Sequence, residues 1–220
     1  MASKPIAICG AGGFGREVRW LIDGINTGDA EWDFVGYFDD DADLRKVDAG
    51  LYLGPVRALE EWSSPLAVVF AIGSPQAKRR LIERVKNPAL WFPTLIHPAC
   101  CVGSGPGSIG EGSIICAGTI ITVDVQIGRH VILNLGCTVG HDTIIGDYSS
   151  FMPTVNISGE VLIGEAVYVG TGASIVNRVE IGRETIVGAG AVVTESLPPY
   201  CTAVGVPARP IEFRGAEPLP

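Results

Sequence analysis

The amino-acid sequence predicts an α/β unit with a small parallel sheet, followed by an all-β parallel β-helix. Two observations predict the β-helix. From Ile109 to Val193 every sixth residue is apolar, and an Ile-Gly pair recurs every eighteen residues, from Ile109-Gly110 to Ile181-Gly182. A six-residue repeat is typical of a parallel β-helix. Eighteen residues then form one coil with three flat faces, a pattern that neither a helical period of 3.6 nor simple alternation explains.

The first ninety or so residues carry alternating strand and helix signals, which indicate a parallel α/β fold. Apolar runs at residues 5–9, 34–38 and 66–72 predict three strands, and residues 16–22 and 76–86 predict two helices. We expect Ser74 to cap the second helix and Pro75 to begin it. The predicted division places the α/β domain at residues 1–92 and the β-helix with its C-terminal tail at residues 93–220.

A glycine-rich turn, Gly10-Ala11-Gly12-Gly13-Phe14-Gly15, follows the first predicted strand. It matches the Rossmann-like pattern G-x-G-x-x-G, in which glycines let the backbone approach a phosphate at a helix N-terminus. The α/β domain has about half the length of a full dinucleotide-binding sheet, so a nucleotide or nucleotide sugar fits better than NAD. Asp39 and Asp40 follow the second strand, where an acid meets a ribose or base edge. Turns that bind no ligand are the alternative for both segments.

The chain has three histidines, and His141 carries the strongest signal for chemistry. It stands at a turn of the repeat, with Asp142 directly after it. The equivalent position one coil later is Gly159, so we expect that a partner can approach His141 closely from that side. An imidazole with a neighbouring carboxylate is suited to general-base catalysis. His97 is expected at a structural junction, and His130 at a solvated turn.

Composition and charge exclude several classes of function. A net charge of -8 argues against nucleic acid or an anionic membrane as a partner. No apolar stretch is long enough to span a bilayer, and six cysteines without a C-x-x-C pair fit a reduced cytoplasm. A zinc carbonic anhydrase needs three converging histidines, which this spacing disfavours, so no metal is expected. A nucleotidyltransferase would need a longer, basic N-terminal domain.

Motifs along most of the chain resemble the two-domain hexapeptide-repeat sugar acyltransferases, a group that includes bacillosamine-pathway acetyltransferases and sialic-acid O-acetyltransferases. These motifs are the glycine turn, Phe38-Asp39-Asp40, Ile96-His97-Pro98, Gly140-His141-Asp142, Ile157-Ser158-Gly159 and the tail 204–209. The resemblance implies a left-handed β-helix and a homotrimer with active sites between neighbouring β-helices. It also implies acetyl-CoA-dependent N-acetylation of a nucleotide-linked amino sugar in bacterial surface glycan biosynthesis.

The resemblance further implies roles for single residues. His141 would be the general base, with Asp142 as its acidic neighbour, and Asn134 would lie near the sugar. The nucleotide would rest on Gly12, Gly13, Phe14, Asp39 and Asp40. Acetyl-CoA would lie near Gly159, Thr171 and Ala189, with Arg209 as a phosphate partner. Two positions depart from the family: Ser150 stands where several members have a second histidine near the acetyl carbonyl, and Phe14 replaces a histidine of the glycine turn.

Two other functions stay open at this stage. One is O-acetylation of a sugar of the sialic-acid type, and a short acyl group other than acetyl would fit as well. The other is a non-catalytic scaffold that binds a nucleotide sugar. The scaffold predicts that replacement of His141 by alanine leaves every measurable property of the protein intact.

Overall fold

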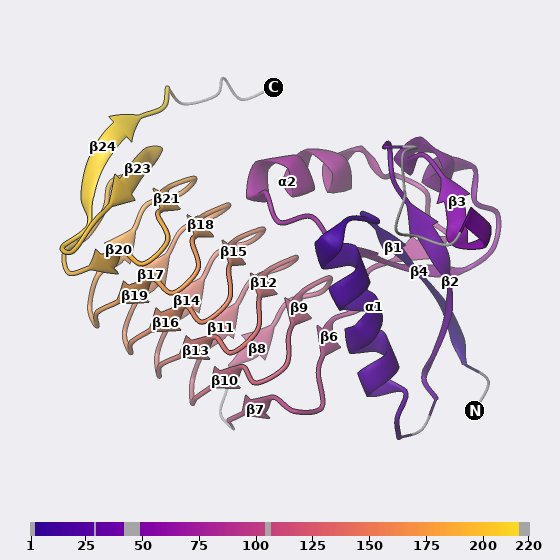
Figure 1. Cartoon of the computed structure of the whole chain (residues 1–220), viewed down its shortest axis with the longest axis horizontal. Coiled ribbons are helices and arrows are strands. Elements are labelled where there is room, and N and C mark those ends of the chain that lie inside the picture. The colour runs from indigo at the N-terminus through magenta and orange to yellow at the C-terminus, as the bar shows by residue number, and fades with distance from the viewer. Residues whose placement is uncertain (1–2, 29, 42–48, 104–106, 216–220) are drawn as a thin grey trace.

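The computed structural model describes residues 3–28, 30–41, 49–103 and 107–215. It has an α/β unit packed against one side of a long parallel β-helix, and the described chain ends in a β-hairpin at the far end of that helix (Figure 1).

The N-terminal unit is a five-stranded parallel sheet in the order β3-β2-β1-β4-β5. β1 and β4 carry continuous apolar runs because both faces of the sheet are covered there, so that no side chain of these runs faces solvent. The predicted three strands and two helices are confirmed, whereas β3, β5 and the two 3₁₀ helices were missed. The elements are β1 (Lys4–Cys9), α1 (Gly13–Ile25), β2 (Trp32–Phe38), η1 (Ala49–Leu51), β3 (Tyr52–Gly54), η2 (Val56–Glu61), β4 (Leu66–Phe70), α2 (Pro75–Arg84) and β5 (Leu90–Trp91).

The two α-helices of this unit begin differently. Ser74 caps α2 as predicted: its hydroxyl accepts a hydrogen bond of 3.4 Å from the N–H of Ala77, and Pro75 is the first helical residue. Gly12 stands at the N-cap of α1 and has no side chain to occupy the first N–H groups. The start of α1 therefore remains open to a ligand.

The β-helix consists of two-residue parallel strands on three faces. From β8 to β22 paired strands lie eighteen residues apart in the sequence, whereas β6 and β7 pair with strands nineteen residues later. The first face holds β6 (Leu95–Ile96), β9 (Ile114–Ile115), β12 (Ile132–Leu133), β15 (Ser150–Phe151), β18 (Tyr168–Val169) and β21 (Ile186–Val187). The second face holds β7 (Cys101–Val102), β10 (Ile120–Ile121), β13 (Thr138–Val139), β16 (Asn156–Ile157), β19 (Ser174–Ile175) and β22 (Val192–Val193). The third face holds β8 (Ser108–Ile109), β11 (Gln126–Ile127), β14 (Ile144–Ile145), β17 (Leu162–Ile163) and β20 (Glu180–Ile181).

The predicted repeat positions fill the axis of the β-helix. From Ile115 to Val193 every sixth residue is buried, and Phe151 in the middle of the series is fully enclosed. The small or β-branched residue two positions earlier also points inward, as Cys137 and Ala173 do. The end of the stack is covered by an antiparallel hairpin of β23 (Cys201–Val204) and β24 (Arg209–Phe213) that continues the first face.

The N-terminal unit covers the first face. Ile114 and Ile132 on this face are buried in the same apolar cluster as Leu21 and Ile22 of α1. On the other two faces the corresponding outward side chains are exposed or half-buried, and Ile120 and Ile144 are exposed. Figure 1 shows α1 and α2 on the side of the β-helix that carries β9, β12 and β15. The second and third faces therefore point away from the chain's own N-terminal unit.

Within the described residues, we find no helix long and apolar enough to cross a membrane.

Candidate active site

The glycine turn contains two kinds of glycine. Gly10 has a φ of +104°, and a Cβ atom at Gly15 would lie 1.9 Å from the carbonyl oxygen of Gly10, so these two positions are required by the turn itself. A Cβ atom at Gly12 would meet nothing within 4 Å, and one at Gly13 would meet only Arg16 at 3.9 Å. Internal packing does not require glycine at Gly12 or Gly13, and both are exposed at the N-terminus of α1. A ligand can therefore reach the backbone there.

The two predicted acids at the end of β2 shape the surrounding loops. Asp39 accepts a hydrogen bond of 2.7 Å from the N–H of Ala11, inside the glycine turn. Asp40 accepts one of 2.9 Å from the N–H of Val56, at the start of η2. The structure therefore gives Asp39 a clear positioning task, which is to hold the turn. Phe14 is half-buried and packs on the apolar core of the unit.

A third loop, which sequence analysis did not assign to the site, lies at the same edge of the sheet. β1 and β4 are neighbours, but the chain proceeds from β1 to one side of the sheet and from β4 to the other. Ligands of open parallel sheets bind at such a switch point, beyond the carboxyl ends of the strands. The loop after β4 contains Gly73, where a Cβ atom would meet nothing within 4 Å. A glycine just after a buried strand was the available signal, but Ser74 was read only as a helix cap.

A cavity of about 410 Å³ lies between this loop and the β-helix. One wall is the segment 73–76, and the other consists of Met152, Tyr168 and Ile186 from the first face. The cavity thus joins the switch point of the sheet to the β-helix. Its lining offers apolar surface, the backbone of Gly73 and the hydroxyl groups of Ser74 and Tyr168.

His141 and Asp142 form a pair at a turn between the second and third faces. Nδ1 of His141 lies 2.7 Å from Oδ2 of Asp142, and both side chains are more than half exposed. Because a carboxylate only accepts, Nδ1 carries the proton, and Nε2 is left free to accept one. The turn requires a φ of +57° at Asp142, a conformation that aspartate tolerates better than most residues.

Gly159 follows His141 in the stack of coils, as predicted, but the space beside it is already filled. A Cβ atom at Gly159 would lie 2.6 Å from Nε2 of His141. The ring of His141 itself, rather than an external partner, occupies the place left by the missing side chain.

The other predicted site residues fall into separate groups. Thr171 and Ala189 occupy equivalent turns one coil apart, where the first face meets the second, and the N–H of Gly190 bonds the carbonyl of Thr171 at 2.8 Å. Asn134 is nearly buried at the end of β12, where its side chain accepts from the N–H of Leu135 at 2.7 Å. Arg209 on β24 is paired with Glu195 at 3.0 Å.

Ser150 has a different environment from the one expected of a residue beside acetyl-CoA. It is fully buried on the first face, and its hydroxyl accepts a hydrogen bond of 3.0 Å from Nζ of Lys78, on α2. Within this chain, Ser150 therefore contacts the N-terminal unit and not the turn that carries His141. We leave it out of the proposed acetyl-CoA site.

His130 corrects a sequence-based expectation. It is 4% exposed rather than solvated, stacks on Tyr148 with ring centroids 5.7 Å apart, and lies against Phe92 of the N-terminal unit. Burial, together with the nearby Lys78 and Arg129, lowers the pKa of His130 to about 4. Among the described residues, its buried Nδ1 finds no hydrogen-bond partner. His130 is therefore an uncharged core residue at neutral pH.

The three histidines lie in three separate environments. His97 is at the junction, as expected: Nδ1 accepts from the N–H of Ala99, and the ring packs 5.3 Å from that of Trp20 on α1. His130 is enclosed and His141 is exposed on another edge. The part of the chain that the structure describes contains no group of three or more His, Cys, Asp or Glu side chains that could hold a metal ion.

Comparisons with known proteins match both parts of the chain. A family model described as the PglD N-terminal domain matches residues 5–85, and one described as bacterial transferase hexapeptide (six repeats) matches residues 160–195. A GDP-perosamine N-acetyltransferase from Escherichia coli O157:H7 is 32% identical over 166 residues, which is 75% of each chain.

Solved structures match nearly the whole chain. The acetyltransferase domain of PglB from Neisseria gonorrhoeae, in complex with acetyl coenzyme A, has a TM-score of 0.85 at 28% identity and covers 96% of this chain and 100% of that one. PerB from Caulobacter crescentus, in complex with CoA and GDP-perosamine, has a TM-score of 0.83 at 30% identity, with 96% and 99% covered. The perosamine N-acetyltransferase from the same organism was also solved with one histidine replaced by asparagine.

Proposed function

The chain belongs to the two-domain hexapeptide-repeat sugar acyltransferases, with their left-handed β-helix, and we propose that it transfers the acetyl group of acetyl-CoA to the amine of a nucleotide-linked amino sugar. The observation that carries the proposal is the His141–Asp142 pair at 2.7 Å, exposed on a β-helix whose relatives bind CoA and a nucleotide sugar. The product would serve the assembly of a bacterial surface glycan.

In the proposed reaction the sugar amine attacks the thioester carbonyl. A carbon–nitrogen bond forms, and the carbon–sulfur bond to CoA breaks. Nε2 of His141 removes a proton from the attacking nitrogen and returns it to the leaving sulfur. Asp142 holds the imidazole by its Nδ1–H, which keeps Nε2 unprotonated before the attack and stabilises the imidazolium that forms afterwards.

The nucleotide is proposed to lie at the switch point of the sheet. Gly12 and Gly13 leave the N-terminus of α1 open to the phosphates, and Asp39 holds the turn in this conformation. Asp40 and Phe14 stay in the proposal as residues at the rim of this site. Gly73 and Ser74 add a second wall, from which the cavity of about 410 Å³ leads the sugar toward the β-helix.

The acetyl-CoA site is proposed on the second face and its edges. Gly159 and His141 lie at one edge, and Thr171 and Ala189 at the other. Arg209 would contact a phosphate of CoA after leaving Glu195, because the exposed ion pair between them contributes little. Asn134, at the end of β12, remains the candidate nearest the sugar. We propose the division between the two domains at residues 92 and 93, a point that lies between the end of β5 at Trp91 and the start of β6 at Leu95.

A homotrimer is proposed because one chain does not bring the two halves of the site together. The glycine turn lies over the first face, whereas His141 lies on the edge between the second and third faces. Four large apolar side chains surround that edge and are between 43% and 47% exposed: Ile120, Val123, Ile144 and Leu162. Such a patch favours contact with a second copy. That copy would present its N-terminal unit to His141.

Release of free CoA tests the proposal. The protein is incubated with acetyl-CoA and a panel of UDP-, GDP- and dTDP-linked amino sugars, and the wild type is compared with His141→Ala. Release with one amino sugar, abolished by His141→Ala, supports the proposed reaction. Release only with a hydroxyl acceptor such as sialic acid would replace it by O-acetylation. Nucleotide binding with no release from any acceptor would replace it by a binding scaffold.

A further inference from the structure

Lys78 lies at the centre of the contact between α2 and the β-helix. It is one turn into α2, where its N–H bonds the carbonyl of Ser74 at 2.9 Å. Its side chain is 1% exposed, and Nζ donates a hydrogen bond of 3.0 Å to Oγ of Ser150. Burial lowers the pKa of Lys78 well below its ordinary value. The amine is thus a polar group enclosed between the two parts of the chain.

The partner of Lys78 belongs to the row of side chains that forms one wall of the cavity. On the first face Ser150 pairs with Tyr168, and Tyr168 pairs with Ile186. Tyr168 and Ile186 line the cavity, and so does Met152, two residues after Ser150. Ser74 belongs to the opposite wall, and its carbonyl accepts a hydrogen bond from the backbone N–H of Lys78. The hydrogen bond from Lys78 to Ser150 therefore ties the two walls together at one end of the cavity.

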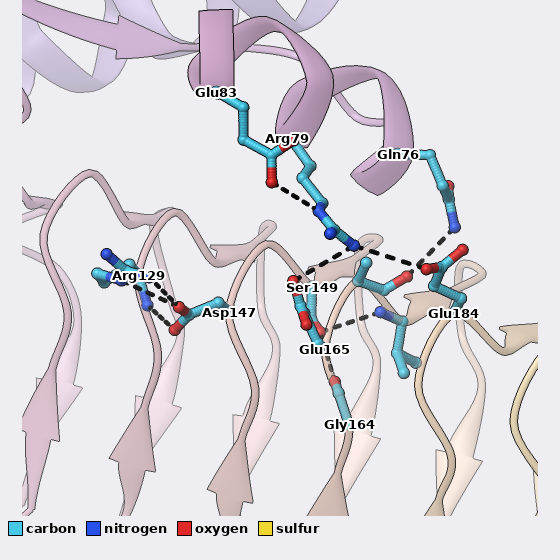
Figure 2. Close-up of polar contacts among 11 residues, drawn as sticks. Gln76, Arg79, Glu83, Arg129, Asp147, Ser149, Gly164, Glu165 and Glu184 are labelled. Carbon is cyan, nitrogen blue, oxygen red and sulfur yellow. Dashed lines mark hydrogen bonds and ion pairs between the residues drawn. The ribbon is translucent and has the colours of Figure 1, made fainter. Parts of the chain in front are cut away.

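The remaining contacts of α2 with the β-helix are more exposed. Figure 2 shows Arg79 between its helix neighbour Glu83, at 2.9 Å, and two acids of the β-helix turns, Glu165 at 3.4 Å and Glu184 at 3.6 Å. Gln76 donates to the carbonyl of Ala166 at 3.4 Å. These ion pairs are only partly buried, so water and salt screen them more than they screen an enclosed contact. Ile82 of α2 is buried in one apolar cluster with Tyr148 and Ala166 of the β-helix. Lys78 is the buried charged-type side chain of α2 at this contact between α2 and the β-helix, which we call the seam.

Burying an amine costs desolvation free energy. An apolar side chain of similar length would fill the same space without the desolvation cost. The amine adds positional specificity, because its hydrogen bond forms only when α2 lies at one position relative to Ser150.

We propose that Lys78 is a positioning residue for the nucleotide sugar: its hydrogen bond to Ser150 sets the spacing between the segment 73–76 and the first face. The proposal rests on the function proposed above. It predicts that Lys78 governs the binding of the nucleotide sugar but not that of acetyl-CoA, whose proposed contacts lie at the edges of the second face and in the C-terminal hairpin.

The experiment compares Lys78→Met and Ser150→Ala with Lys86→Met, a matched change at an exposed lysine beyond the end of α2. The dissociation constants of UDP and GDP are measured by calorimetry, and KM is measured for both substrates in the CoA-release assay. We expect Lys78→Met and Ser150→Ala each to raise the dissociation constant of the nucleotide and KM for the nucleotide sugar by about tenfold. KM for acetyl-CoA should stay unchanged. Lys86→Met should match the wild type. A purely structural role would change thermal stability and leave the two KM values in their wild-type ratio, which would overturn the proposal.

A second readout does not depend on the reaction. Amide hydrogen exchange of the segment 73–79 is compared in the three variants without any ligand, and faster exchange in Lys78→Met and Ser150→Ala alone supports the positioning role. A wild-type protein that binds neither nucleotide and releases no CoA would contradict the proposed function. Wild-type exchange in both seam variants would instead contradict the role of Lys78. Should Lys78→Met fail to fold, Ser150→Ala removes the acceptor and leaves the amino-acid sequence of α2 unchanged.

Discussion

The imidazole of His141 lies over Gly159, its neighbour one coil further along the β-helix, so closely that a Cβ atom at Gly159 would be 2.6 Å from Nε2. This contact and the hydrogen bond to Asp142 fix the ring from two sides. The proposed base is therefore held in place before substrates bind, which is a requirement for efficient proton transfer.

The first prediction concerns this contact. Gly159→Ala should displace the ring of His141 and lower kcat by about 10²-fold, because small misplacements of a catalytic group are costly. Thermal unfolding should change little, since His141 is exposed and can move outward. Gly28→Ala is the control, because a Cβ atom there meets nothing within 4 Å. A wild-type kcat in Gly159→Ala would show that the position of the ring does not matter.

The second prediction ranks the members of the pair. His141→Ala should lower kcat by roughly 10²–10⁴-fold, and Asp142→Ala by about tenfold, since orientation is only part of the task of a base. Asp142→Asn should retain more activity than Asp142→Ala, because its amide oxygen can still accept from Nδ1. Steady-state kinetics with saturating acetyl-CoA measure all three. An Asp142→Ala variant slower than His141→Ala would contradict these roles.

The third prediction concerns the carboxylate that holds the glycine turn. Asp39→Ala removes the acceptor for the N–H of Ala11, so the turn should loosen and the affinity for UDP or GDP should fall about tenfold. KM for acetyl-CoA should not change. Asp33→Ala, at an exposed position on β2, is the matched control. Equal nucleotide affinity in both variants would show that Asp39 does not contribute to nucleotide binding.

The fourth prediction concerns pH and stability. The folded-state pKa of His130 is lowered to about 4 from 6.5, so between these values the unfolded chain binds a proton that the folded chain does not. Stability should therefore be lost as the pH falls from 6.5 toward 4, by up to about 3 kcal/mol from this group. His130→Phe should remove that part of the loss. Urea midpoints at pH 7 and pH 4.5 measure it, and parallel pH curves for variant and wild type would contradict it.

The repeat allowed the β-helix to be predicted position by position, because every axial residue faces the same apolar interior. The stacking of His141 on Gly159 followed from the eighteen-residue period. What the period could not supply was the occupant of the space beside Gly159, because side-chain direction depends on rotamers that the repeat leaves free.

Residues at the seam were misread for another reason. His130 and Ser150 look like ordinary turn and face positions within their own stacks. They are buried by Phe92 and Lys78, which come from the N-terminal unit. Gly73 was missed because its proposed role depends on strand order, which places β4 beside β1. Contacts between parts distant in sequence are outside the reach of local patterns.

The most direct test of the proposed site is complementation between two inactive variants. His141→Ala removes the proposed base, and Gly12→Trp places a bulky side chain at the glycine turn, where a Cβ atom meets nothing within 4 Å. Each variant alone should be inactive. When both are produced together in equal amounts in one cell, about three quarters of the randomly assembled trimers contain both variants. Each mixed trimer holds one intact site of three, so the whole population should recover about a quarter of wild-type CoA release. No recovery, with mixed oligomers confirmed by mass spectrometry, would place His141 and the nucleotide on the same chain and contradict a site shared between copies.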